Sequence, residues 1–384
     1  MNNMTITILN QHTNNFGDEA AGISLIDTLN EKYNFPEINI IYNGDGKIQC
    51  KYSNVYHKIE YKLKYMGYIN ILFKIFFKNF KGNKTMQKYD ELMRKSDYIF
   101  IAPCGANIGI YKDWRFLIRI LFAIYNNKTP IFYLNTIGKS GNFLFDKISI
   151  YVLKHSKVYV REFASHEYLN NIGIKNKLGI DTAFLFKHNY KGNIDNNKIC
   201  IVLSDVTGHK NFKNIDGFEL VKNYILPSII EYAQKEKKKI SFLPHLNSDD
   251  ELKFLKKVCY YIEQQYKFNN YEITKIMTVN DYYDEIASSR FVVGMRYHAA
   301  VLAAKSFTPF ISLAYENKMI EVSNYTKMNN YCRSLYNDLE SLNLYYLLKS
   351  IDNNNDVIRI KLKNNIRKIK YKAELPLSEI NNEK

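Results

Sequence analysis

An arginine and a histidine stand two residues apart in a stretch that is otherwise apolar or small. They are Arg296 and His298, in FVVGMRYHAAVLAAKSFTPFISLAY, which runs from Phe291 to Tyr315. RFVVG has the flat, β-branched character of a buried parallel strand. AAVLAAKS is typical of a helix that packs closely through its alanines, and PFISLAY of the next strand. We therefore expect Arg296 and His298 between the end of a strand and the start of a helix.

That position predicts an anion-binding site. In open α/β sheets ligands bind at the carboxyl ends of the strands, and a helix N-terminus attracts anions through its free N–H groups and its dipole. An arginine adds a planar fork that fits a carboxylate or a phosphate, and a histidine can donate to phosphate or carry a proton near neutral pH. Taken singly, each residue is explained as well by a surface arginine or a hydrogen-bonded core histidine. The pair in one turn, directly after Gly294, favours the anion site.

The rest of the chain alternates short β-branched runs with helical patterns, which predicts parallel sheets built from βαβ units. In the first half MTITILN, EINIIY, YIFIAP and PIFYLN are strand-like, with helices over 17–33 and 114–125. In the second half KICIVLSD, KISFLPH and YEITKIM are strand-like, with helices near 218–236, 250–265 and 281–287. We expect an α/β protein with two Rossmann-like parallel-sheet domains facing a cleft.

Domain boundaries follow from the polar segment KHNYKGNIDNNK over 187–198, which has the composition of a linker. We expect an N-terminal α/β domain over 1–190, a C-terminal α/β domain over 196–345, and a basic C-terminal helix and tail over 346–384. A chain of 384 residues is long enough for two domains of roughly 150–200 residues each.

Composition restricts the partners and cofactors. The chain has 54 Lys and Arg against 38 Asp and Glu, a formal charge of +16, which favours an anionic partner. The basic residues are dispersed and accompany no nucleic-acid recognition motif, so we expect no nucleic acid. The five cysteines lack metal-ligand spacing. We therefore expect no metal, no cofactor and reduced thiols in the cytoplasm.

Several segments also resemble a known family. GMRYHAAVLAAKSFTPFISLAYENK resembles the C-terminal signature of the polysaccharide pyruvyl transferase family, with Gly-x-Arg-x-His, an alanine-rich helix, a proline-led strand and Tyr-x-x-Lys. NQHTNNFGDEAAGISLI resembles the family's N-terminal turn, and YIFIAPCGANIG its strand and glycine loop. VYVREFASHEYLNNIGI, followed by GIDTAFLF, resembles its Arg-Glu-x-x-Ser block and the aspartate after it. The resemblance covers roughly residues 4–325. It departs at PCGANIG, where the family more often has consecutive glycines, and at Tyr297, often aliphatic elsewhere.

The resemblance implies a GT-B-like fold and transfer of pyruvate from phosphoenolpyruvate onto a sugar of a polysaccharide or lipid-linked glycan as a cyclic ketal. It implies Arg161 and Arg296 as the main anion clamps, His298 as a phosphate-side donor or general acid, and Lys318 as a further cation. The remaining candidates are Asp18 and Glu19 as bases or acceptor-binding groups, Gly105 in the ligand loop, Asp181 orienting Arg161, His245, His209 and His12.

For three of these candidate groups a structural explanation stays open. Asp181, in GIDTAF, could orient Arg161 or have a structural role in a turn. Asp18 and Glu19 would also suit the first turn of a helix, where acidic side chains are favourable. His245, in LPHLNSDDE, could contact the substrate or cap the helix that begins at Asp249–Asp250.

Two other questions stay open at this point. A nucleotide-sugar-dependent glycosyltransferase of GT-B type could place a diphosphate at the Arg296–His298 turn, with the acidic residue of AYENK on the ribose. YKLKYMGYINILFKIFFKNFKGNK could be an amphipathic helix docked on an anionic bilayer or a core helix with its lysines reaching outward. No run reaches the roughly 18 apolar residues of a membrane span. We expect a cytoplasmic protein, with peripheral contact at the inner face of the membrane as an alternative.

Overall fold

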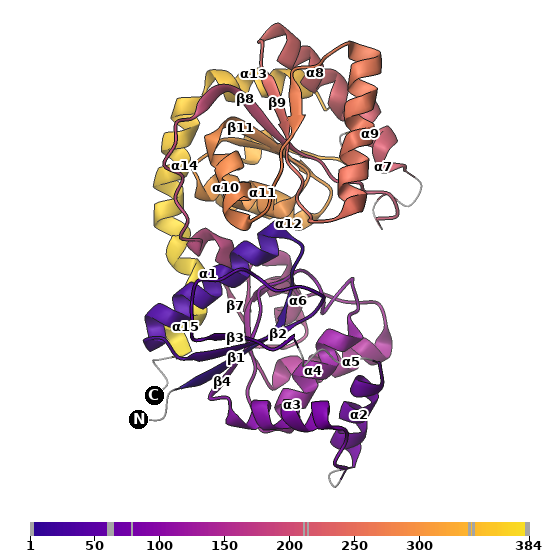
Figure 1. The fold of residues 1–384 in the computed structure, drawn as a ribbon, viewed down its shortest axis with the longest axis vertical. Coiled ribbons are helices and arrows are strands. Elements are labelled where there is room, and N and C mark those ends of the chain that lie inside the picture. The colour runs from indigo at the N-terminus through magenta and orange to yellow at the C-terminus, as the bar shows by residue number, and fades with distance from the viewer. Residues whose placement is uncertain are drawn as a thin grey trace. The chain divides into compact units, whose positions relative to one another are not determined.

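The computed structural model describes residues 4–59, 65–77, 80–209, 212, 215–336, 339 and 342–380. These residues form two compact α/β units, each built on a parallel sheet (Figure 1). Of the described chain, unit 1 takes residues 4–13, 18–187 and 370–380, and unit 2 takes residues 14–17 and 188–369. The predicted pair of parallel-sheet α/β domains is confirmed.

Unit 1 contains a seven-stranded parallel sheet in the order β3-β2-β1-β4-β5-β6-β7. After β1 the chain fills one side of the sheet and then returns to add β4 on the other side of β1, so the topological switch point lies between β1 and β4. The strands are β1 (Thr5–Gln11), β2 (Glu37–Tyr42), β3 (Val55–His57), β4 (Tyr98–Ile101), β5 (Ile131–Asn135), β6 (Lys157–Val160) and β7 (Lys177–Leu178).

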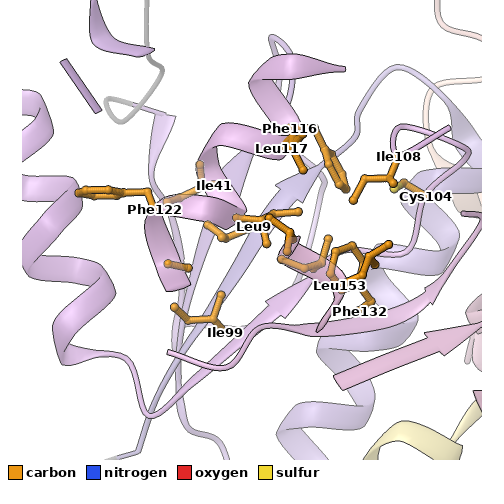
Figure 2. Packing of buried hydrophobic residues seen from close by; sticks show 14 of the residues in the cluster. Leu9, Ile41, Ile99, Cys104, Ile108, Phe116, Leu117, Phe122, Phe132 and Leu153 are labelled. Carbon is orange, nitrogen blue, oxygen red and sulfur yellow. The ribbon is translucent and has the colours of Figure 1, made fainter. Parts of the chain in front are cut away.

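The core of unit 1 is a cluster of apolar side chains between this sheet and its helices. Figure 2 shows Leu9, Ile99 and Phe132 from the strands packed with Leu117 and Leu153 from the helices. Each such side chain contributes about 1.5–3 kcal/mol when fully buried. The helices of the unit are α1 (Phe16–Tyr33), α2 (Tyr65–Phe76), α3 (Lys84–Lys95), α4 (Trp114–Tyr125), α5 (Phe143–Lys154), α6 (Phe163–Asn171) and α15 (Leu375–Ile380).

Unit 2 contains a six-stranded parallel sheet in the order β10-β9-β8-β11-β12-β13, whose switch point lies between β8 and β11. The strands are β8 (Asp195–Val202), β9 (Lys239–Phe242), β10 (Tyr271–Ile273), β11 (Ser289–Gly294), β12 (Phe310–Ala314) and β13 (Cys332–Ser334). The helices are α7 (Gly217–Leu220), α8 (Leu226–Lys235), α9 (Asp249–Tyr266), α10 (Val279–Ser288), α11 (Tyr297–Lys305), α12 (Asn317–Tyr325), α13 (Leu344–Asn353) and α14 (Asn355–Ile369).

The C-terminal segment differs from the expectation of a separate helix and tail over 346–384. Helices α13 and α14 belong to unit 2, where Asn355 donates to the Arg290 carbonyl at 2.7 Å and α14 buries Leu362. From residue 370 the chain packs in unit 1, where Tyr133 donates to the Ala373 carbonyl at 3.2 Å. The apolar face of α14 and these contacts explain why the segment is part of both units.

Two further features bear on ligands. Among the residues that the structure describes, no helix combines the length and the apolar character needed to cross a bilayer. The described ranges also contain no group of three or more His, Cys, Asp or Glu side chains arranged to hold a metal ion. In the basic, aromatic segment over 61–84, residues 65–76 form α2, and residues 61–64 and 78–79 lie outside the described part of the chain.

Candidate active site

The turn between β11 and α11 carries Arg296 and His298 at the switch point of unit 2. The Met295 N–H donates to the Val202 carbonyl at 2.8 Å, which continues the pairing of β11 with β8 for one more residue. Arg296 is the N-cap of α11, with extended backbone (φ −122°, ψ 134°) and no side-chain cap. The predicted strand, turn and helix are confirmed. Arg296 therefore lies at the N-terminus of the helix, the positive end of its dipole.

Glu251 holds the Arg296 side chain in place. Arg296 Nη2 lies 3.0 Å from Glu251 Oε2, and the other carboxylate oxygen accepts from the backbone N–H groups of His245 and of Leu246, the latter at 3.1 Å. Glu251 lies in the first turn of α9, where Ser248 is the cap. The Glu251 carboxylate thus binds both the turn after β11, through Arg296, and the turn after β9, through His245 and Leu246.

The guanidinium remains charged and partly accessible. Burial lowers the pKa of Arg296, but Tyr315, Glu251 and Tyr282 outweigh burial and the pKa is raised overall. Its side chain is 20% exposed, whereas the Glu251 side chain is 5% exposed. Arg296 Nε is buried and has no hydrogen-bond partner within the described residues. A buried donor of this kind is rare in folded proteins and suits a ligand that accepts from it.

His245 follows β9 and is almost fully buried, at 2% exposed. Its Nδ1 lies 2.9 Å from the Tyr282 hydroxyl. Burial, followed by the positive charges of Arg296, His298 and Lys318, holds the pKa of His245 well below its ordinary value of 6.5. The imidazole is therefore neutral at pH 7. The alternative that His245 caps the following helix is wrong, because the Ser248 side chain does so.

His298 packs against the short segment of residues 14–17 that joins unit 2. It is 5% exposed, its ring centroid lies 6.3 Å from that of His245, and a Cβ at Gly17 would fall 2.1 Å from its Cγ. The neighbouring Phe16 stacks on Tyr282 at 5.4 Å and donates its N–H to the His245 carbonyl at 3.3 Å. Gly17 is therefore needed for this close approach.

A second cation, Lys318, lies in the first turn of α12, the helix that follows β12. Lys318 Nζ is 2.5 Å from Glu316 Oε2 and 5.9 Å from the centre of the Tyr297 ring. His209 Nε2 is 3.0 Å from the other oxygen of Glu316. Burial raises the pKa of Glu316, but Lys318 and His209 lower it by more, so its carboxyl is ionised. Two carboxylates thus hold basic groups of unit 2, Glu251 binding Arg296 and Glu316 binding Lys318 and His209.

Unit 1 holds a different arrangement around Arg161, which directly follows β6. Arg161 Nη1 pairs with Asp181 Oδ2 at 2.6 Å, and Nε donates to Thr136 at 3.1 Å. Both side chains of the ion pair are buried, at 2% and 0% exposed. The expected pairing of Asp181 with Arg161 is confirmed. The alternative role in a turn holds too, because Asp181 accepts the Ala183 N–H at 2.8 Å and caps the short helix Thr182–Leu185. The part of Arg161 as an anion clamp stays a prediction, since its pairing with Asp181 already occupies one edge of the guanidinium.

The other predicted residues of unit 1 lie near the carboxyl ends of β1 and β4. Asp18 and Glu19 are in the first turn of α1, half-buried, where their charge also suits the helix dipole. Gly105 accepts the Asn107 N–H at 2.8 Å in the loop after β4, and the Asn107 amide lies 2.8 Å from His12 Nε2. The predicted residues therefore divide, with Arg296, His298, His245 and Lys318 together in unit 2 and Arg161, Asp18, Glu19 and Gly105 in unit 1.

Sequence reasoning missed Glu251 and the contact of residues 14–17 with unit 2. Glu251 ends the acidic run SDDE at a predicted helix start, which signals only a favourable first turn. Asn247 donates its N–H to the Asn14 carbonyl at 3.1 Å, a pairing of residues far apart in the chain. No local pattern in NNFGDE distinguishes which unit its first residues join.

The neutral state of His245 predicts that stability falls in mild acid. Below about pH 6.5 the unfolded chain takes up a proton at this residue, while the folded chain does not, so folding becomes less favourable as pH falls. His245→Asn removes the titration and can keep a bond to Tyr282. Between pH 7.5 and 5.5 the wild type should lose up to about 1.4 kcal/mol per pH unit more than the variant. Urea unfolding of both proteins measures this, and identical pH profiles would contradict it.

Comparison with known proteins adds family and fold to this geometry. The family model for polysaccharide pyruvyl transferase matches residues 15–317. No curated protein matches the sequence. At 11–13% identity, the likeness to solved structures below shows the fold alone, which is of GT-B type as expected.

Three of these structures illustrate the likeness. The UDP-GlcNAc 2-epimerase of Methanocaldococcus jannaschii is 13% identical over 91% of this chain and 92% of that one, with a TM-score of 0.54. The Neisseria meningitidis UDP-GlcNAc 2-epimerase bound to UDP-GlcNAc is 12% identical over 99% and 100%, with a TM-score of 0.56. The α,α-trehalose 6-phosphate synthase of Burkholderia multivorans is 11% identical over 99% and 98%, with a TM-score of 0.56.

Proposed function

The chain belongs to the polysaccharide pyruvyl transferase family, and we propose that it moves pyruvate from phosphoenolpyruvate onto a sugar of a polysaccharide or lipid-linked glycan as a cyclic ketal. The observation that carries this proposal is the turn after β11, where a charged, partly exposed arginine keeps a buried Nε donor beside the N-terminus of α11. A cytoplasmic location, with contact at the inner face of the membrane when the acceptor is lipid-linked, is part of the same proposal.

Donor binding is the part of the reaction that this turn suits. Phosphoenolpyruvate carries a phosphate and a carboxylate on a three-carbon frame, so its binding in a dry site needs several fixed donors. Arg296 would take one anionic group through its fork, and the positive end of the α11 dipole would favour the other. Lys318 adds a positive charge in the first turn of α12. Neutral His245 can accept or donate a hydrogen bond without adding a competing charge.

Formation of the ketal changes both C2 and C3 of phosphoenolpyruvate. A first sugar hydroxyl attacks C2 while C3 takes a proton, which turns the methylene into a methyl group. A second hydroxyl then displaces phosphate from C2 and closes the ring. Of the two hydroxyl protons, one balances the proton gained by C3 and the other leaves with phosphate. The step therefore needs an acid near C3 and charge compensation for the departing phosphate.

We assign proton donation to His298 and the compensation of phosphate charge to Arg296. His298 is held between Gly17, Tyr297 and His245, which fixes its ring. A histidine whose ring is held in one place can deliver a proton in one direction. The roles expected of Asp18 and Glu19 as bases, of Arg161 as a second clamp and of Gly105 in the ligand loop stay predictions.

Incubation with phosphoenolpyruvate and candidate glycans tests the proposal. Released phosphate and the mass of the glycan are followed together, in water and in deuterium oxide. We expect phosphate release that depends on the glycan, one pyruvyl ketal per phosphate, and one carbon-bound deuterium in the ketal methyl group in deuterium oxide. Phosphate release without a modified glycan, or a ketal without deuterium, would contradict the mechanism.

The competing function is a nucleotide-sugar-dependent glycosyltransferase, which the fold also accommodates. It requires an acidic group for the ribose, and Glu316, the residue expected for it, is engaged by both His209 and Lys318. Thermal-shift measurements with phosphoenolpyruvate and with nucleoside diphosphates separate the two functions. We expect a rise in melting temperature with phosphoenolpyruvate. A rise with nucleotides alone would favour the glycosyltransferase.

A further inference from the structure

Helix α2 of unit 1 exposes a row of phenyl rings. Its inner face is part of the core, with Tyr68 5% and Ile71 0% exposed. On the outer side Phe76 and Phe77, at the C-terminal end of the helix, are 76% and 61% exposed, and Phe73 is 47% exposed. The Phe73 ring stacks on that of Phe77 at 5.9 Å. Because these rings are neighbours on one surface, they form an apolar patch rather than scattered exposed residues.

The groups beside these rings carry an excess of positive charge. A cavity of about 350 Å³ between α2 and α3 is lined by Lys74, Lys81, Met86, Gln87, Asp90, Glu91 and Arg94. Both carboxylates of the lining are paired with cations of α3, Asp90 with Arg94 at 2.7 Å and Glu91 with Lys95 at 2.6 Å. The lining therefore carries three cations, Lys74, Lys81 and Arg94, against two carboxylates.

We propose that the α2–α3 surface, formed by Phe73, Phe76, Phe77, Lys74 and Lys81, docks on an anionic lipid bilayer. The rings would enter the boundary between headgroups and acyl chains, and the lysines would meet lipid phosphates. Aromatic side chains with nearby lysines are the pattern of helices that lie in a membrane interface. Lysines near an anionic surface and rings in the interface both favour reversible binding.

The charge of the surface decides between a bilayer and a second copy of the chain. Two copies that met through this surface would bring Lys74 and Lys81 of each close to those of the other, and like charges repel across an interface. An anionic bilayer instead complements both the lysines and the net charge of +16. The inference concerns elements of unit 1 that carry none of the candidate site residues, so it holds whether or not the proposed reaction does.

Co-sedimentation of the full-length chain with lipid vesicles tests this inference. Vesicles of phosphatidylcholine alone are compared with vesicles that also contain phosphatidylglycerol, at low and physiological salt. We expect binding at least about tenfold tighter to the anionic vesicles, and weaker binding as salt rises. Phe76→Ala/Phe77→Ala should weaken binding at least about tenfold through lost apolar contact. Lys81→Glu should weaken binding to the anionic vesicles only.

Matched controls come from α5 of the same unit. Phe143 is 83% exposed and Lys147 is exposed, so Phe143→Ala and Lys147→Glu make the same chemical changes at another surface. Both should bind vesicles like the wild type. Absence of wild-type binding to anionic vesicles, or equal losses in the α5 variants, would overturn the proposal. So would a dimer in sedimentation equilibrium that Phe76→Ala/Phe77→Ala converts to monomer, since a second copy would then occupy this surface.

Discussion

Arg296→Lys should lower the rate of phosphoenolpyruvate-dependent phosphate release at least about 100-fold and leave the fold intact. Lysine keeps a positive charge opposite Glu251, so the buried carboxylate retains a partner. Lysine lacks the planar guanidinium, in which Nη2 binds Glu251 while Nε has no partner among the described residues and is left for a ligand. Loss of one fixed donor to a developing charge costs about 3–4 kcal/mol, which corresponds to 100-fold or more in rate.

The Arg296→Lys variant is more informative than Arg296→Ala. Arg296→Ala would leave Glu251, 5% exposed, without its cation, and breaking a buried ion pair in this way costs about 3–5 kcal/mol of stability. A loss of activity could then reflect unfolding. Steady-state rates and melting temperatures of the wild type, Arg296→Lys and Arg290→Lys provide the measurement. Arg290 lies near the opposite end of β11 and binds Asp352, so Arg290→Lys should keep its activity within about threefold. Wild-type activity in Arg296→Lys would remove the arginine from the mechanism.

Gly17→Ala should lower the same rate at least about 100-fold although it adds a single methyl group. The new Cβ would fall 2.1 Å from Cγ and 2.2 Å from both Cβ and Nδ1 of His298. Because the clash includes the His298 Cβ, no rotation of the imidazole relieves it, and either the histidine or residues 14–17 must move. Overpacking of this kind costs about 1–3 kcal/mol, and a displaced proton donor loses about 100-fold or more in rate.

The control for this substitution is Gly44→Ala, whose new Cβ has no atom within 4 Å and whose residue is exposed. Rates and urea unfolding of both variants and of His298→Ala should be measured together. We expect Gly17→Ala to resemble His298→Ala in rate and to be less stable than Gly44→Ala. If Gly17→Ala were as active as Gly44→Ala, His298 would not need the position that this segment gives it.

The elements around the site could be predicted from the sequence because their patterns are local. The β-branched run before Gly294 is typical of a strand, and the alanine-rich run after His298 is typical of a helix. The boundary between the two elements can therefore be predicted from the sequence. The same reasoning placed His245 after β9, whereas Lys318 was named by the resemblance of Tyr-x-x-Lys to the family signature. Parallel strands end at one edge of a sheet, which is why these residues lie together in unit 2.

Contacts between residues far apart in the sequence could not be predicted, because no hydrophobic period or motif spacing encodes them. Glu251 and Arg296 are 45 residues apart, and the helix that carries Glu251 shows only an acidic first turn. Residues 14–17 join unit 2 although α1 continues into unit 1, and residues 370–380 pack in unit 1 although α14 belongs to unit 2. These exchanges depend on tertiary contacts such as Phe16 on Tyr282. The exposed rings of α2 likewise could not be separated from its buried face before burial was known.

Calorimetric titration of phosphoenolpyruvate into the wild type and Arg296→Lys tests most directly whether the turn after β11 is the donor site. The account predicts one molecule bound per chain, binding weakened at least about tenfold in Arg296→Lys, and weaker binding of pyruvate or phosphate alone, because each carries one anionic group. Equal affinity of both proteins for phosphoenolpyruvate would contradict it, as would binding of a nucleoside diphosphate with none of phosphoenolpyruvate.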